Sequence, residues 1–143
     1  MAPIGNRYLQ GQPVLPYTNY KALSGNDGFL DLQFVDHTQT PVTPTAISLE
    51  IDDITNTVDM LGPVTLSPTG ATSGSLIYPA FTSSEWTLQI AASILTMTYP
   101  YVGSQLCQVK LSFQALDSVS GAPFNGVGLA IIELCSVASV TGF

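Results

Sequence analysis

The sequence has few charged residues, and cations are the rarest of them. Only 9% of its residues are charged, whereas an ordinary soluble domain has about 25%. Arg7, Lys21 and Lys110 are the 3 cations beside 10 acidic residues, and the net charge is −7. Nucleic acid and anionic lipid both require a positive surface. We therefore expect neither nucleic acid nor a membrane as a partner. A surface this poor in charge instead favours contact with other subunits, although an ordinary threonine-rich β-protein is the alternative.

Residues that carry out chemistry are also scarce. His37 is the single histidine, so it is the one candidate for a Ser-His-Asp triad or a histidine metal site. It falls in a predicted turn beside Asp36, where a solvated turn residue is the simpler interpretation. The sequence has no Gly-x-Ser-x-Gly motif and no Walker-type lysine motif, which nucleophile elbows and phosphate loops require. We therefore expect a protein that is not an enzyme and binds no cofactor.

The 2 cysteines, Cys107 and Cys135, permit one disulfide. The N-terminus does not combine a charged segment with an apolar run, as a signal peptide does. No apolar stretch reaches the length of about 18 residues that would span a membrane. We therefore expect a soluble protein made in the cytosol, where thiols stay reduced, and two free cysteines.

Alternation of apolar and polar residues dominates the remaining sequence. In the stretch 44–53, Ile47, Leu49 and Ile51 share one face, which is the period of a half-buried strand. This strand is expected to form a hairpin with the strand predicted at 28–35. The last two long strands, predicted at 105–116 and 127–137, are expected to form another. Short strands separated by Gly/Pro turns are typical of an all-β sandwich, with a small barrel or jelly roll as the alternative. Further strands are predicted at 28–35, 57–61, 64–66, 75–78, 86–90, 105–116 and 127–137, while 93–99 is either a strand or a helical turn.

The last predicted strand is apolar on both faces, which predicts that another element or a partner covers its outer face. Its inward positions would be Ala130, Ile132 and Leu134, an arrangement that turns Cys135 away from the preceding strand. Glu133 interrupts the apolar run. We interpret it as pairing with Lys110 across the sheet, or as an outward charge that discourages edge pairing.

Two neighbouring acids, Asp52 and Asp53, end the strand at 44–53. They suggest a carboxylate pair or, together with Asp59, a calcium site built from oxygen ligands. Adjacent strand residues point to opposite faces of a sheet. We therefore expect the two aspartates to end the strand and cap the following turn instead.

The first 27 residues have a different character. Pro3, Pro13 and Pro16 interrupt them, and proline favours extended paths because it fixes φ and lacks an N–H. Residues 1–27 are therefore predicted to form an extended arm that is not a sheet component, followed by a β-sandwich domain at 28–143. Five large side chains would anchor the arm to its own domain or bind a partner: Tyr8, Leu9, Leu15, Tyr17 and Tyr20.

Residues 27–137 resemble the small immunoglobulin-like structural proteins of tailed bacteriophage virions. The resemblance rests on the strand at 29–34, the turn at 36–41, the strand at 44–53, the segment 86–90 and the closing long hairpin. It implies a single immunoglobulin-like β-sandwich of about seven strands without enzymatic activity. It also implies a capsid decoration (cement) protein that bridges capsid subunits, or a neck or tail component. Its partners would be the major capsid protein or other virion subunits, including copies of itself, and its location the virion.

A receptor-binding or glycan-binding β-sandwich module is the alternative function. Such a module needs exposed aromatic side chains in a groove. Trp86 alternates with Leu88 and Ile90, so we expect it in the core. The aromatic residues near predicted loops or strand ends are Tyr78, Phe81, Trp86, Tyr99 and Tyr101.

Overall fold

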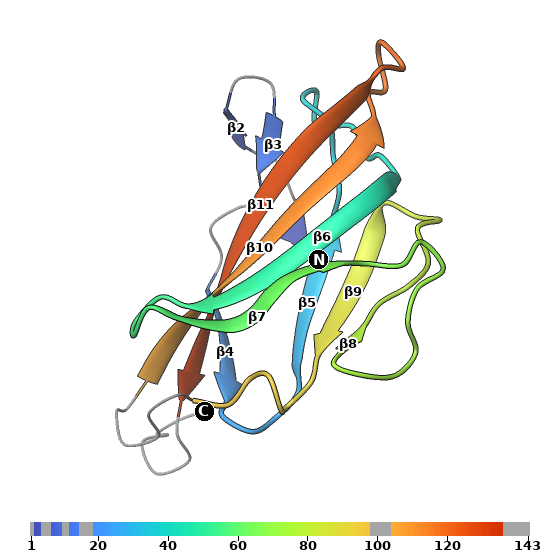
Figure 1. The fold of residues 1–143 in the computed structure, drawn as a ribbon. Helices are drawn as coiled ribbons and strands as arrows, with labels where there is room; N and C mark the ends of the chain where they lie inside the picture. Colours follow the sequence, from blue (N-terminus) through green and yellow to red (C-terminus); the bar gives the residue numbers. More distant parts are fainter. Residues whose placement is uncertain (1, 4–6, 10–11, 15–18, 98–103, 136–143) are drawn as a thin grey trace.

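The computed structural model describes residues 2–3, 7–9, 12–14, 19–97 and 104–135, and these residues form strands and turns (Figure 1). Among them there is no helix, and so none that is long and apolar enough to cross a membrane. The strands are β1 (Ala2–Pro3), β2 (Arg7–Leu9), β3 (Gln12–Val14), β4 (Asn19–Leu23), β5 (Gly28–Gln33), β6 (Pro44–Asp53), β7 (Val58–Thr65), β8 (Leu76–Ile77), β9 (Glu85–Ile90), β10 (Ser104–Leu116) and β11 (Pro123–Cys135).

Two sheets pack face to face. The antiparallel part of one sheet has the order β5–β9–β8, and that of the other has the order β11–β10–β6–β7. An immunoglobulin-like sandwich places strands B, E and D in one sheet and G, F and C in the other, and its variable type adds C′ beside C. Strands β5 to β11 reproduce this order from B to G. The expected fold class, an all-β immunoglobulin-like sandwich, is therefore confirmed.

One core fills the space between the sheets, and the alternation of residues along each strand produces it. Ile47, Leu49 and Ile51 of β6 are buried as predicted. Trp86 of β9 is 1% exposed; it meets Phe34 edge-on, with ring centroids 5.5 Å apart. Burying one large apolar side chain contributes roughly 1.5–3 kcal/mol, so these alternating faces supply the main driving force for folding.

The predicted hairpin between β5 and β6 is wrong, because the two strands lie in different sheets. Strand β5 pairs with β9, and β6 pairs with β10 and β7. The connection 34–43 crosses from one sheet to the other instead of turning within one. Alternation fixes which face of a strand is buried but not which strand it pairs with, so both arrangements fit the sequence.

Strand β7 also differs from the prediction, which broke it at Gly62 and Pro63. It runs unbroken from Val58 to Thr65. It lies at the edge of its sheet, where it pairs only with β6 among the described strands. Proline is tolerated in an edge strand because its missing N–H can face solvent.

The expectation that the first 27 residues are not a sheet component is also corrected. Strand β1 pairs in parallel with β5, and β4 pairs in parallel with β11 over residues 19–23. Strands β2 and β3 form a small hairpin, and β3 contacts β11. Tyr8 and Leu9 lie in β2 and Tyr20 lies in β4, whereas Leu15 and Tyr17 lie outside the described residues. Their role in binding a partner stays a prediction.

The closing hairpin of β10 and β11 is confirmed, and it runs from the pair Ser104–Cys135 to the pair Leu116–Pro123. Cys107 lies opposite Ile132 and Cys135 lies opposite Ser104, so no disulfide joins the two cysteines. The inner positions of β11 are buried as expected: Ala130, Ile132 and Leu134. Ile131, on the opposite face, is 1% exposed, so the outer face of β11 is covered there too.

The proposed pairing of Glu133 with Lys110 is wrong. Lys110 lies opposite Leu129 on β11 and opposite Glu50 on β6, while Glu133 lies opposite Leu106. The register of a hairpin is set by its turn, and the turn here is shorter than the sequence suggested because β11 already begins at Pro123.

Candidate functional site at the loop end

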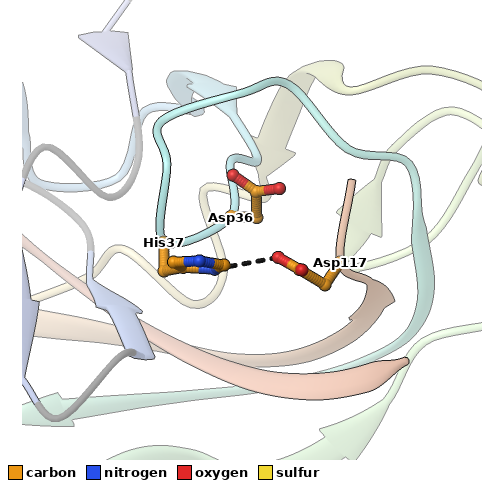
Figure 2. A group of neighbouring side chains, drawn as sticks. All are labelled: Asp36, His37 and Asp117. Carbon is orange, nitrogen blue, oxygen red and sulfur yellow. Dashed lines mark ion pairs between the residues drawn. The ribbon is translucent and has the colours of Figure 1, made fainter. Parts of the chain in front are cut away.

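Side chains from two distant connections meet at one end of the sandwich, which we call the loop end. The connection 34–43 joins β5 to β6, and the turn 117–122 joins β10 to β11. Between them lie Asp36, His37 and Asp117 (Figure 2). One ligand atom from each lies within 4.8 Å of the others. Asp36 is 0% exposed and Asp117 is 8% exposed, whereas His37 is 48% exposed.

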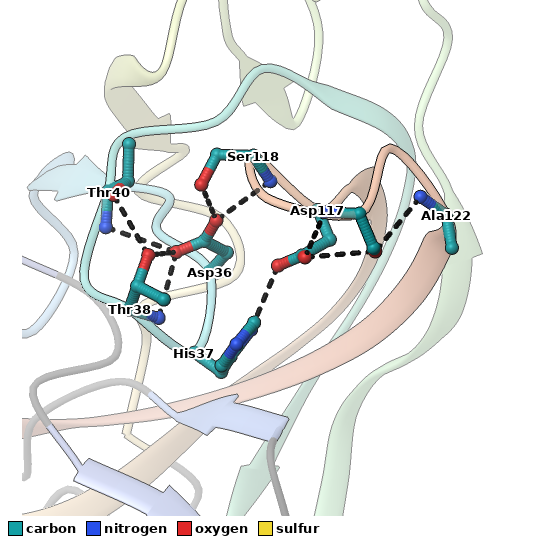
Figure 3. A network of polar contacts seen from close by, with 8 residues as sticks. Asp36, His37, Thr38, Thr40, Asp117, Ser118 and Ala122 are labelled. Carbon is teal, nitrogen blue, oxygen red and sulfur yellow. Dashed lines mark hydrogen bonds and ion pairs between the residues drawn. The ribbon is translucent and has the colours of Figure 1, made fainter.

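Asp36 accepts hydrogen bonds at both carboxylate oxygens (Figure 3). Its Oδ1 accepts from the backbone N–H of Thr38 at 2.9 Å, from the Thr38 hydroxyl at 2.6 Å and from the N–H of Thr40 at 3.1 Å. Its Oδ2 accepts from the N–H of Ser118 at 2.9 Å and from the Ser118 hydroxyl. Burial raises the pKa of Asp36, but the hydrogen bonds from Ser118 and Thr38 outweigh it and hold that pKa well below its usual range.

Asp117 closes the turn between β10 and β11. Its Oδ2 accepts from the N–H of Ser120 at 2.9 Å and from the Ser120 hydroxyl at 3.0 Å. Its Oδ1 lies 2.8 Å from Nδ1 of His37. The hydrogen bond from the Ser120 N–H lowers the pKa of Asp117, and the Ser120 hydroxyl and His37 lower it further against the effects of burial and Asp36. The two carboxylates thus join the crossing connection to the hairpin turn.

The arrangement has part of the geometry of a catalytic triad. In a triad, an aspartate binds Nδ1 of the histidine while the serine hydroxyl binds the other ring nitrogen. His37 and Asp117 have the first relationship, but the Ser118 hydroxyl donates to Asp36 instead of to the imidazole. The histidine therefore has no link to this serine, and the cluster does not activate it as a nucleophile.

A metal ion also fits the cluster poorly. A carboxylate offers about four lone-pair positions, and Asp36 already accepts from five donor atoms. An ion there would have to displace these donors. The cluster is better explained as a network of hydrogen bonds and one ion pair that links two loops. This agrees with the interpretation of His37 as a turn residue and not with a catalytic or metal-binding role.

An open, mainly apolar groove of about 750 Å³ lies beside this polar cluster. Its lining comes from four segments of the chain: Pro41, Val42, Thr43, Pro44, Thr45, Pro68, Phe81, Leu116, Asp117, Ser118 and Gly121. Phe81 packs on the buried Trp86 with ring centroids 5.3 Å apart. Leu116, the last residue of β10, is 53% exposed at the groove, and Val119, in the turn that follows, is 74% exposed. The loop end therefore presents apolar surface on a firmly held backbone.

The sequence did not single out this groove, although a cluster of prolines (Pro41, Pro44 and Pro68) was a signal for rigid loops. Of the aromatic residues considered for glycan binding, Trp86 is in the core as expected and Tyr78 is 8% exposed. Phe81 is partly exposed at the groove. The other two, Tyr99 and Tyr101, lie outside the described residues.

Asp52 and Asp53 point to opposite faces, as predicted. Asp53 is 0% exposed and caps the turn after β6: its Oδ1 accepts from the N–H groups of Thr55 and Asn56, each at 3.0 Å. Asp52 lies on the outer face opposite Asp59. Asp53 therefore does end the strand, whereas Asp52 belongs to a different surface.

The fold and the loop end together define an immunoglobulin-like β-sandwich with an exposed apolar surface at one end, beside two loops that are linked by hydrogen bonds and an ion pair. No protein-family model matches the chain, and a search of curated proteins found no match.

Proposed function

We propose that the protein is a non-enzymatic structural protein of a bacteriophage particle, where it acts as a capsid decoration (cement) protein that bridges neighbouring capsid subunits. The observation that carries the proposal is the loop-end surface. Leu116 and Val119 are exposed there beside an apolar groove. Exposed apolar surface of this kind marks interaction sites in soluble proteins.

The rigidity of the loop end supports the same role. Asp36 and Asp117 fasten the two loops that form the groove walls. A surface held in its binding shape loses less conformational entropy when a partner binds. A cement protein has to hold many identical positions of a shell, so each contact gains from such preorganisation, and many contacts together give avidity.

The composition agrees with this role. With 9% charged residues, much of the surface is neutral and can be buried against a shell at little cost in desolvation. The resemblance of residues 27–137 to small immunoglobulin-like virion proteins points in the same direction.

The proposal is tested with the double substitution Leu116→Asp and Val119→Asp. Purified phage particles that lack the protein are mixed with the variant, and the bound fraction is measured by cosedimentation. We expect at least about a tenfold loss of affinity, because two exposed apolar contacts are replaced by charges. Phe29→Asp is the matched control, since Phe29 is 58% exposed on β5 of the other sheet and should bind normally. Unchanged binding of the double variant would contradict the proposal.

Receptor or glycan binding is the second candidate, because the groove combines Phe81 with the hydroxyl-bearing residues Thr43, Thr45 and Ser118. Sugars bind to such mixtures of aromatic faces and hydroxyl groups. A glycan array probed with the isolated protein separates the two functions. Saturable binding to one class of glycan that Phe81→Ala abolishes would favour this second function.

A further inference from the structure

The end of the sandwich opposite the loop end carries a second unusual surface, on the outer face of the sheet β11–β10–β6–β7. We call it the hairpin-end patch and define it by Glu50, Asp52, Ile54, Asp59 and Leu106. The first three lie on or directly after β6, Asp59 lies on β7 and Leu106 on β10. Figure 1 shows the β6–β7 turn at the lower left and the β10–β11 turn at the upper right, at opposite ends of the strands.

Like charges face each other across two strands of this patch. Asp52 is the cross-strand partner of Asp59, and Glu50 lies two residues before Asp52 on the same face. Burial raises the pKa of Asp52, and so do the charge of Glu50 and the hydrogen bond and charge of Asp59, while Lys110 lowers it. Like charges directly opposite each other destabilise a sheet. Lys110 already lies opposite Glu50 on this face. The opposed carboxyl groups of Asp52 and Asp59 are therefore the part of the patch whose repulsion a further cation would relieve.

Exposed apolar side chains adjoin these acids. Leu106 is 38% exposed and Ile54 is 42% exposed. The N–H of Ile54 donates to the carbonyl oxygen of Leu106 at 3.0 Å, so the two residues are neighbours where β6 ends beside β10. Exposed apolar residues rimmed by polar groups are typical of protein–protein contact sites.

We propose that the hairpin-end patch docks a cationic surface of another protein, with lysine or arginine side chains beside Asp52 and Asp59 and an apolar residue against Leu106 and Ile54. The negative charge of the patch favours a cationic partner over a second copy of the chain. A second copy of the chain would bring another net charge of −7 and the same acids to the contact. Lys110 is the only lysine or arginine whose side chain the structure describes, and it lies opposite Glu50.

The hairpin-end patch lies far from the loop end along β10, which matters for assembly with other proteins. Leu106 and Leu116 both lie on β10, separated by ten residues of strand, or about 33 Å. The hairpin-end patch and the loop end can therefore contact two different partners at once. The inference stands on the sheet face itself and does not depend on the proposed virion role.

The experiment is an NMR titration of the full-length ¹⁵N-labelled protein with a synthetic peptide that alternates lysine and leucine. We expect chemical-shift changes confined to residues 50–59 and 106–110, and weaker binding at high salt. The double variant Asp52→Asn with Asp59→Asn should bind the peptide about fivefold more weakly. It should fold normally because the substitutions remove a repulsion. Leu106→Ser should also weaken binding, which a purely electrostatic contact would not show.

The matched control is Asp31→Asn with Glu85→Gln, which removes the same charge from the outer face of the other sheet and should change affinity less than about twofold. Equal weakening by both double variants, or shifts spread over both sheets, would show attraction to net charge alone and overturn the proposal. Absence of any shift at low salt would also overturn it. Calcium chloride is titrated in parallel. Calcium that produces the same shifts and displaces the peptide would make the patch a cation site instead.

Discussion

Ser118 follows Asp36 by 82 positions in the chain, yet both its backbone N–H and its hydroxyl donate to the same carboxylate oxygen of Asp36. Asp36 belongs to the connection that crosses between the sheets, and Ser118 belongs to the turn of the long hairpin. This relationship ties the two sheets together at the loop end. It also fixes the shape of the groove, because the same two segments line it.

Asp36→Asn should destabilise the protein by about 2–4 kcal/mol. The amide NH₂ of asparagine would replace one of the two carboxylate oxygens that now accept hydrogen bonds. The N–H of Thr38 or of Ser118 would then face another donor beside the buried side chain of residue 36 and lose its partner. Thermal unfolding followed by circular dichroism measures the effect as a fall in Tm of roughly 5–15 °C. Asp31→Asn serves as the control, since Asp31 is exposed and accepts from the Thr87 hydroxyl. A loss as small in Asp36→Asn as in the control would contradict the role assigned to Asp36.

The free energy of unfolding should fall steeply in acid. The pKa values of Asp36 and Asp117 lie below the ordinary value of 3.8 in the folded protein. A carboxylate with such a lowered pKa stabilises the fold above its unfolded pKa, and the stabilisation is lost as the pH falls through the folded value. Urea unfolding between about pH 7 and pH 2 tests this, and the Asp36→Asn variant should show a flatter dependence on pH. A wild-type stability that stays constant down to about pH 2 would contradict it.

Asp52→Asn should have the opposite effect and stabilise the protein at neutral pH. The pKa of Asp52 is raised above 3.8 in the folded protein. The ionised carboxylate therefore lowers the free energy of unfolding, and it does so in full at pH values above this raised pKa. Removing the charge should raise the free energy of unfolding by about 0.3–1 kcal/mol at pH 7. The gain should disappear well below pH 3.8, where Asp52 is neutral in both states. A gain that is the same in acid would show that charge repulsion is not its cause.

Gly126→Ala should destabilise the core. A Cβ atom at this position would fall on the ring of Phe113. That ring cannot move aside easily, because it packs against Phe34 and Phe124 with centroids 4.9 Å and 5.9 Å away. Overpacking of this kind costs about 1–3 kcal/mol, which denaturant unfolding would detect.

Gly62→Ala is the matched control for that substitution, since its added Cβ would meet no atom closer than 3.5 Å. The rescue is Phe113→Leu in the Gly126→Ala background, which should recover part of the lost stability if the clash is the cause. A Gly126→Ala variant as stable as the control would show that the core yields at this point.

The sequence predicted the buried faces of the strands well. The alternation of Ile47, Leu49 and Ile51 has one physical solution, a strand with those residues inside, and the structure has it. Which strands pair with each other was harder to predict from the sequence. The connection 34–43 could turn back or cross to the other sheet, and the choice depends on the packing of two whole sheets instead of on the turn residues.

The candidate site was only partly visible in the sequence. The turn chemistry around Asp36 and His37 was recognised, because an aspartate followed by threonines forms local hydrogen bonds. The partnership of Asp36 with Ser118 could not be recognised, since nothing local links residues 82 positions apart. The hairpin-end patch was hidden for a similar reason, because Asp52 and Asp59 become opposed only through the register of β6 and β7.

The most direct test of the proposed function is the copy number of the protein in purified phage particles, measured by quantitative mass spectrometry against the major capsid protein. We predict a copy number on the same order as that of the capsid subunits, because a cement protein occupies repeated positions of the shell. A count of only one or two symmetric rings, about six or twelve copies, would place the protein in the neck or tail and contradict the capsid role. Absence from the particles would contradict a virion role altogether.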